Sequence, residues 1–160
     1  PPGIRLSTVA NAVPEALRGM SYNLYMVEQR RYWEDSPLYV HDEWAAYLNG
    51  LTVGLESSHE GTYSDVLQPL EFMGYCCCLL RLVENRSDVE VDALRDLTAY
   101  QTIRTVKLYK ESNSRQRFKS DLQKDYYGKF CEEFTLDFRR WCGPSWTSEL
   151  LGDGNYGGIF

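Results

Sequence analysis

Apolar residues recur at helical spacing along most of the chain. The clearest stripe lies in the second quarter, where residues at i, i+4, i+7, i+8 and i+11 are apolar: Val40, Trp44, Tyr47, Leu48 and Leu51. This spacing places them on one face of an amphipathic helix. Asn49-Gly50 favours a helix end. The pattern therefore predicts a helix over about residues 40–49, with Val40 and Trp44 in the core.

Four further helices are expected. One covers about residues 22–35, with Ser21 as its N-cap. Another runs over about 65–85 and is apolar nearly all round, which predicts a position at the centre of the fold. A third extends from about residue 90 to 110, after the capping-box sequence Ser87 to Glu90. The last covers about 115–142, where aromatic or aliphatic residues recur every four positions from Phe118 to Phe138.

The two ends of the chain lack a sustained period. Residues 1–20 contain three prolines and two glycines, a composition that indicates an extended arm. Residues 144–160 form a glycine-rich tail that retains Trp146, Tyr156 and Phe160, and we expect these aromatics to be pinned to a surface. The sequence thus predicts one all-α domain over 1–160: an extended arm (1–20), an irregular bundle of about five helices (21–143) and a tail (144–160).

Composition bears on the kind of partner. Aromatics make up 14% of the 160 residues, which suits either a thick core or a surface used for protein contacts. The net charge of −6 argues against a nucleic-acid-binding domain. The basic run between Arg104 and Lys129 is interrupted by acidic residues, so we interpret it as a solvated helix face. The longest mainly apolar run, residues 70–83, is too short to cross a bilayer.

No set of residues resembles a complete catalytic or metal site. Five cysteines occur without a Cys-x-x-Cys spacing, and Cys76 to Cys78 are consecutive, so one helix face cannot direct them at one ion. They are expected to be unpaired. The two histidines, His41 and His59, are isolated from other candidate ligands. We therefore expect a non-enzyme without metal or cofactor.

One stretch resembles a known family. Eight residues stand in the family's order without a gap: Tyr25, Glu28, Trp33, Pro37, Val40, His41, Trp44 and Tyr47. They are similar to the N-terminal segment of the thiamine-dependent first enzyme of the 2-oxoglutarate dehydrogenase complex, where a pattern of this kind forms two short helices. Ser36 stands where the family has Asp, so the turn between the helices is expected to differ. A weaker similarity covers Leu97 to Arg104, with one residue inserted.

The resemblance implies a non-catalytic module. In that family the cofactor-binding and catalytic domains follow this region, so no thiamine diphosphate binding is expected here. The family's N-terminal region contributes to attachment to the other components of the complex. The leading hypothesis is an accessory subunit that docks onto protein subunits of a larger mitochondrial assembly, in the matrix or on its matrix side. That assembly is either a 2-oxoacid dehydrogenase complex or a respiratory complex.

A second hypothesis is a small ligand-binding or regulatory domain, such as a secreted effector or a viral protein, which a deep apolar pocket would favour. Under the leading hypothesis, the candidate partner-binding residues are Trp33 and His41, which lie off the apolar stripe, together with Trp146, Tyr156 and Phe160 of the tail.

Overall fold

The computed structural model describes residues 3–57, 66–114 and 121–151, and within these ranges it contains helices and no strand. The expected all-α class is confirmed. In chain order the elements are α1 (Leu6–Ala12), the 3₁₀ helix η1 (Glu15–Leu17), the π-helix η2 (Tyr22–Glu28), α2 (Arg30–Trp33), α3 (Tyr39–Ser57), α4 (Leu67–Val83), α5 (Val91–Ser114), α6 (Asp121–Cys142) and α7 (Pro144–Leu151). The described part of the chain thus holds more helical elements than the five expected.

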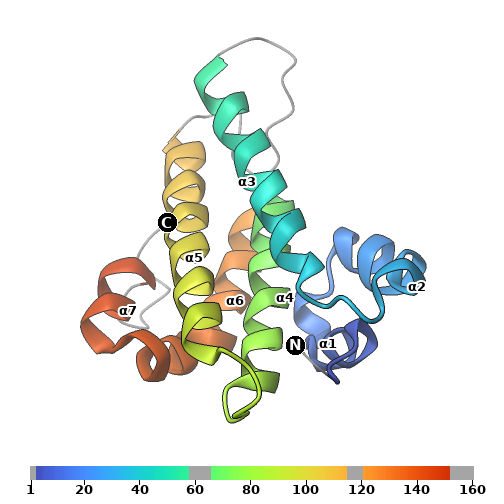
Figure 1. Ribbon diagram of the computed structural model, residues 1–160. Helices are drawn as coiled ribbons and strands as arrows, with labels where there is room; N and C mark the ends of the chain where they lie inside the picture. Colours follow the sequence, from blue (N-terminus) through green and yellow to red (C-terminus); the bar gives the residue numbers. More distant parts are fainter. Residues whose placement is uncertain (1–2, 58–65, 115–120, 152–160) are drawn as a thin grey trace.

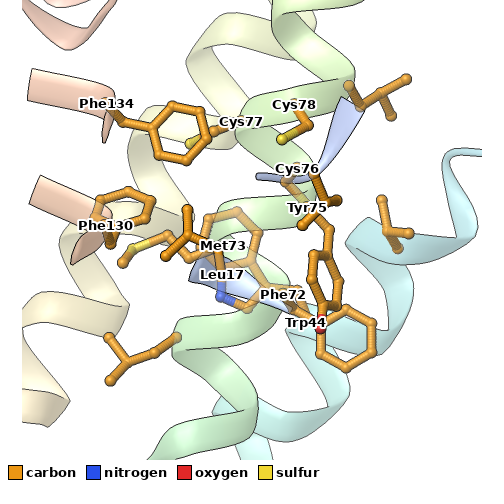
Figure 2. Packing of buried hydrophobic residues seen from close by; sticks show 14 of the residues in the cluster. Leu17, Trp44, Phe72, Met73, Tyr75, Cys76, Cys77, Cys78, Phe130 and Phe134 are labelled. Atoms are coloured by element: carbon orange, nitrogen blue, oxygen red, sulfur yellow. The ribbon is translucent and has the colours of Figure 1, made fainter. Parts of the chain in front are cut away.

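Helix α4 occupies the centre of the molecule. All residues from Pro69 to Leu80 are buried, because α1, α3, α5 and α6 pack against this helix (Figure 1). Figure 2 shows Trp44 of α3, Phe72 of α4 and Phe130 of α6 in the cluster around it. The central position predicted from the all-round apolar pattern is confirmed.

Helix α3 is longer than the sequence predicts. Val40 and Trp44 are fully buried, as expected. The helix does not end at Asn49-Gly50, however, and continues to Ser57. Leu51 and Leu55 carry the buried stripe two turns further. Burial of a leucine contributes about 1.5–3 kcal/mol, which outweighs the cost of about 1 kcal/mol for one glycine in a helix.

The prediction of an extended arm over residues 1–20 is wrong. This segment forms α1 and η1, and Leu6, Val9, Val13 and Leu17 are buried. The spacing of these residues is that of a short amphipathic helix followed by one more apolar turn. Prolines and glycines lie at the borders of this segment, which makes the short pattern hard to recognise in the sequence. In the structure Pro14 lies between the two helices and interrupts neither of them.

The tail also differs from the expectation of an irregular segment over 144–160. Gly143 adopts φ +89°, a conformation that favours glycine, and it ends α6. Pro144 then begins α7, where proline is well tolerated. The Trp146 ring stacks on Phe138 with centroids 5.2 Å apart, so this aromatic is held against the bundle. Tyr156 and Phe160 lie outside the described residues.

A charged network fastens α4 to α6. The Arg81 guanidinium pairs with Glu133 at 2.5 Å and with the buried Asp137. Its central carbon also lies 4.2 Å from the centroid of the Phe134 ring. One turn further, the carboxylate of Glu84 accepts hydrogen bonds from Arg140 and from the Trp141 indole N–H. Paired and hydrogen-bonded in this way, the charges can remain at the edge of the core.

Among the described residues, no helix combines the length and apolar character needed to cross a bilayer.

Candidate interaction surface

A buried carboxylate binds the backbone just before η2, the helix in which the family resemblance begins. Glu71 of α4 has no exposed surface, and it accepts hydrogen bonds from the backbone N–H groups of Met20 (3.1 Å) and Ser21 (2.7 Å). The Tyr75 hydroxyl donates a third bond at 3.3 Å. The free N–H groups at a helix start carry partial positive charge, so a carboxylate is well placed there. Glu71 therefore fixes the start of this segment to the centre of the fold.

The pKa of Glu71 is raised, because burial disfavours the charged carboxylate. Hydrogen bonds from Ser21, Tyr75 and Met20 act in the opposite direction. The sequence predicts instead that the Ser21 side chain caps this helix. No such cap bond forms, and the Ser21 residue is buried beside Glu71, to which its backbone N–H donates.

The helix that follows is a π-helix, η2. Its last turn closes with a bond from the Gln29 N–H to the Leu24 carbonyl five residues back, at 2.9 Å. Buried Ser21 and Met26 are likewise five residues apart. Short π-helical segments occur frequently at functional sites. The wider turn changes which side chains share a face, so the α-helix expected over 22–35 would orient them differently.

Aromatic contacts fix the inner side of the segment. The Tyr25 ring packs edge-on against Phe72 at 5.0 Å, and its hydroxyl lies 2.7 Å from that of Tyr47. Burial, then the bond to Tyr47, raises the pKa of Tyr25, so its hydroxyl stays protonated. The Trp33 ring stacks on Tyr39 at 4.1 Å, with 4° between the planes. Ring pairs of this geometry add to the energy of burial, and they hold η2 and α2 on α3 and α4.

The outer side of the segment exposes many large apolar side chains. Exposed positions recur about every four residues, at 23–24, 27–28 and 31–33. Of the eleven exposed large hydrophobic residues in the described part of the chain, six lie between residues 20 and 38. We call these six residues the η2–α2 surface: Met20, Leu24, Val27, Tyr32, Trp33 and Leu38. Val27 is 53% exposed and Tyr32 is 65% exposed, so both are available to a partner.

Two charged residues on this side have no ion pair among the described residues. The Arg31 guanidinium lies 4.7 Å from the centroid of the Tyr32 ring and donates a hydrogen bond to its hydroxyl. Glu28, three residues earlier, is also exposed. In contrast, Arg30 pairs with Glu34 at 3.6 Å. The surface thus presents one unpaired acid and one unpaired base beside its apolar side chains.

The three predicted partner-binding residues that the structure describes do not come together. Trp33 belongs to the η2–α2 surface and is 38% exposed. His41, expected on a partner-facing rim, is only 5% exposed and lies beside Trp44 in the core. Neither of its ring nitrogens has a hydrogen-bond partner. Trp146 is half-buried on α7, at the opposite side of the bundle from α2 (Figure 1).

Most of the η2–α2 surface was not predicted from the sequence. Met20, Leu24 and Val27 are spaced by four and three residues, which the sequence does reveal. That spacing is equally typical of a buried stripe, and only the fold shows which side α4 covers.

The described residues lack a cluster of metal ligands, and the cleft that they form is mostly charged. Among them, no three His, Cys, Asp or Glu side chains are placed to hold a metal ion. A cleft of about 490 Å³ lies where α4 meets α5. Charged residues dominate its lining, including Glu84, Arg86, Glu90, Asp92 and Arg95. Arg86 pairs with Asp88 and Arg95 pairs with Asp92, so these cations are already neutralised.

Comparisons with protein families, with curated proteins and with solved structures found no match, and the resemblance to the thiamine-dependent enzyme therefore stays a prediction.

Proposed function

We propose that this chain is a non-catalytic interaction subunit that docks onto other proteins through the η2–α2 surface. The observation that carries the proposal is the concentration of exposed large hydrophobic residues between Met20 and Leu38. Exposed apolar patches commonly mark protein-binding sites. Tyr, Trp and Arg are also enriched among the residues that dominate binding energy, and Tyr32, Trp33 and Arg31 are consecutive here.

The anchoring of the segment supports this proposal. Glu71 holds the start of the segment, and the stacking of Trp33 on Tyr39 holds its end. A surface fixed before binding loses less conformational entropy on association than a mobile one. The same contacts also hold the apolar side chains outward, where a partner can cover them.

A ligand-binding domain is the alternative class. A deep apolar pocket would favour it. The cleft beside α5 has a charged lining instead, so the interaction role is the better-supported function.

The proposed setting is a mitochondrial assembly, either a 2-oxoacid dehydrogenase complex or a respiratory complex. Its support is the resemblance of residues 25–47 to the N-terminal segment of the dehydrogenase. In the fold these residues form most of η2, all of α2 and the start of α3. They include four of the six residues of the η2–α2 surface: Val27, Tyr32, Trp33 and Leu38.

The test compares a tagged wild-type chain with Val27→Asp, both expressed in the cells of origin. Native gel electrophoresis of a mitochondrial extract should place the wild type in a large assembly and the variant in a small species. Leu136→Asp is the matched control, because Leu136 is 72% exposed on α6, outside the surface. Both variants should melt like the wild type. Migration of the wild type as a free chain, or an equal loss with Leu136→Asp, would contradict the proposal.

A further inference from the structure

We propose that the protein bound by the η2–α2 surface places an aspartate or glutamate side chain on Arg31, within a segment that is otherwise mainly apolar. This inference rests on the proposed function, because it names the chemistry of the partner that covers the same surface. It follows from the contacts of Arg31 with Tyr32, from its lack of an ion pair and from the exposed apolar residues beside it.

The Arg31 guanidinium is held in position by its neighbour. It lies 4.7 Å from the centroid of the Tyr32 ring and donates a hydrogen bond of 2.7 Å to the Tyr32 hydroxyl. A guanidinium carries five N–H groups in one plane, and this arrangement matches the two oxygens of a carboxylate. Because the side chain is already ordered, a carboxylate can bind it with a smaller loss of conformational entropy.

A partner that covers the apolar side chains also removes water from Arg31. Val27 is 53% exposed and Tyr32 is 65% exposed, and the guanidinium lies against the Tyr32 ring. Arginine keeps its charge in proteins, and loss of water around a charge weakens binding unless an opposite charge replaces that water. A neutral acceptor, such as a backbone carbonyl, leaves the charge uncompensated. A carboxylate of the partner therefore fits this position best.

The other charges limit how acidic the partner segment can be. Glu28 is exposed, lies three residues before Arg31 and has no ion pair among the described residues. The whole chain carries a net charge of −6. Both features disfavour the approach of a strongly acidic segment. A single carboxylate among apolar side chains pairs with Arg31 and still covers the apolar residues of the surface.

Arg30 provides a comparison on the same helix. Its guanidinium already pairs with Glu34 of the chain itself, at 3.6 Å. A partner carboxylate gains less beside a charge that is already compensated. The inference therefore assigns different roles to two consecutive arginines, and each experiment below uses Arg30 as the matched control.

Zero-length cross-linking of the native assembly tests the inference. A carbodiimide joins an amine to a carboxylate that touches it, and it does not couple a guanidinium. In the assembly isolated from the cells of origin, the tagged Arg31→Lys chain should form an amide between position 31 and an Asp or Glu of another protein. Mass spectrometry of the digested product identifies both residues. The wild type should form no such link, and Arg30→Lys should link only to Glu34 of its own chain.

The outcomes separate this inference from the proposed function. An intact assembly without a link from position 31 to another protein overturns the inference and leaves the proposed function standing. A link from position 31 only to this chain, or to a second copy of it, also overturns the inference. A wild type that enters no assembly contradicts the proposed function and, with it, the inference.

A binding series gives a second readout that does not depend on the introduced amine. The purified tagged chain is titrated into a mitochondrial extract depleted of the native chain, and the fraction in the large assembly is measured. Arg31→Gln should weaken binding by about tenfold or more, whereas Arg30→Gln should leave it nearly unchanged. Added salt should weaken binding of the wild type more than that of Arg31→Gln. Both variants should melt like the wild type, and equal binding by Arg31→Gln and the wild type overturns the inference.

Discussion

The indole N–H of Trp44 in α3 donates a hydrogen bond to the Thr105 hydroxyl oxygen in α5, at 2.9 Å. Both residues are fully buried. The Thr105 hydroxyl in turn donates to the Gln101 carbonyl one turn earlier, so each polar group has a partner. This contact joins the helix that follows the η2–α2 surface to the far side of the bundle. Trp44 therefore contributes both apolar packing in the core and a hydrogen bond between α3 and α5.

Replacing Trp44 by Ala should therefore destabilise the isolated chain by about 3–5 kcal/mol, the range for loss of a buried large aromatic side chain. Trp44→Phe should cost less, because it keeps much of the packing and loses the bond to Thr105. Trp33→Ala should change stability by only about 1 kcal/mol, since that ring is partly exposed and stacks on Tyr39. Urea unfolding of the three variants measures these differences. A larger loss for Trp33→Ala than for Trp44→Ala would reverse the assignment.

Stability should fall as the pH drops below about 6.5, because of His41. Burial lowers the pKa of His41 to about 4, and neither ring nitrogen has a partner that would favour the charged form. The unfolded chain binds a proton at this residue near pH 6.5. Between these two values the unfolded state binds more protons, so acid favours unfolding. The expected contribution is a loss of about 2 kcal/mol between about pH 7 and pH 5.

Urea unfolding at neutral and at mildly acidic pH checks this expectation, with His41→Phe as the comparison. The variant has no group to titrate at this position, so its stability should change less over the same interval. Equal changes in the variant and the wild type would show that other groups dominate the pH dependence.

Long periodic patterns predicted the centre of the fold well. Helices α4 and α6 were expected from apolar positions that extend over many turns, and tertiary packing followed the same pattern. The helices of the N-terminal segment were not predicted, because the stripe from Leu6 to Leu17 is short and Pro14 interrupts it. Local proline and glycine residues give no information about tertiary packing, and the sequence therefore does not show that these apolar residues pack against α4.

The candidate surface was only partly predictable. Trp33 and His41 both lie off the main stripe of α3, yet only Trp33 is exposed. Helix α3 is covered by both α4 and α5, so its buried side is wider than the stripe and includes His41. The role of Glu71 was equally hidden. A single carboxylate near the start of an apolar run was visible, but its backbone partners lie 50 and 51 residues away in the sequence.

The cysteines should differ in reactivity in the native chain. All five are unpaired; Cys76, Cys77, Cys78 and Cys131 are buried, and Cys142 is partly exposed. Burial raises the pKa of each thiol, to about 12 for Cys131, so little reactive thiolate forms at neutral pH. Cys142 should therefore alkylate first, and five adducts should form only after unfolding. Intact-mass measurement without reductant checks this, and a smaller number of adducts in denaturant would indicate a disulfide.

The final prediction concerns Gly19 and Glu71. A Cβ added to Gly19 would overlap the Glu71 side chain, and all three of the nearest atoms belong to that residue. Gly19→Ala should therefore destabilise the fold by about 1–3 kcal/mol through overpacking. Glu71→Ala should cost several kcal/mol, because it leaves the N–H groups of Met20 and Ser21 without their acceptor.

The double variant separates the contact between Gly19 and Glu71 from their other roles. Once Glu71 is replaced by Ala, the obstacle to a side chain at position 19 is gone. Adding Gly19→Ala to Glu71→Ala should then cost less than about 0.5 kcal/mol, within the error expected for independent sites. A double-mutant cycle measured by urea unfolding gives this coupling directly. Additive losses would show that Gly19 is required for some reason other than its contact with Glu71.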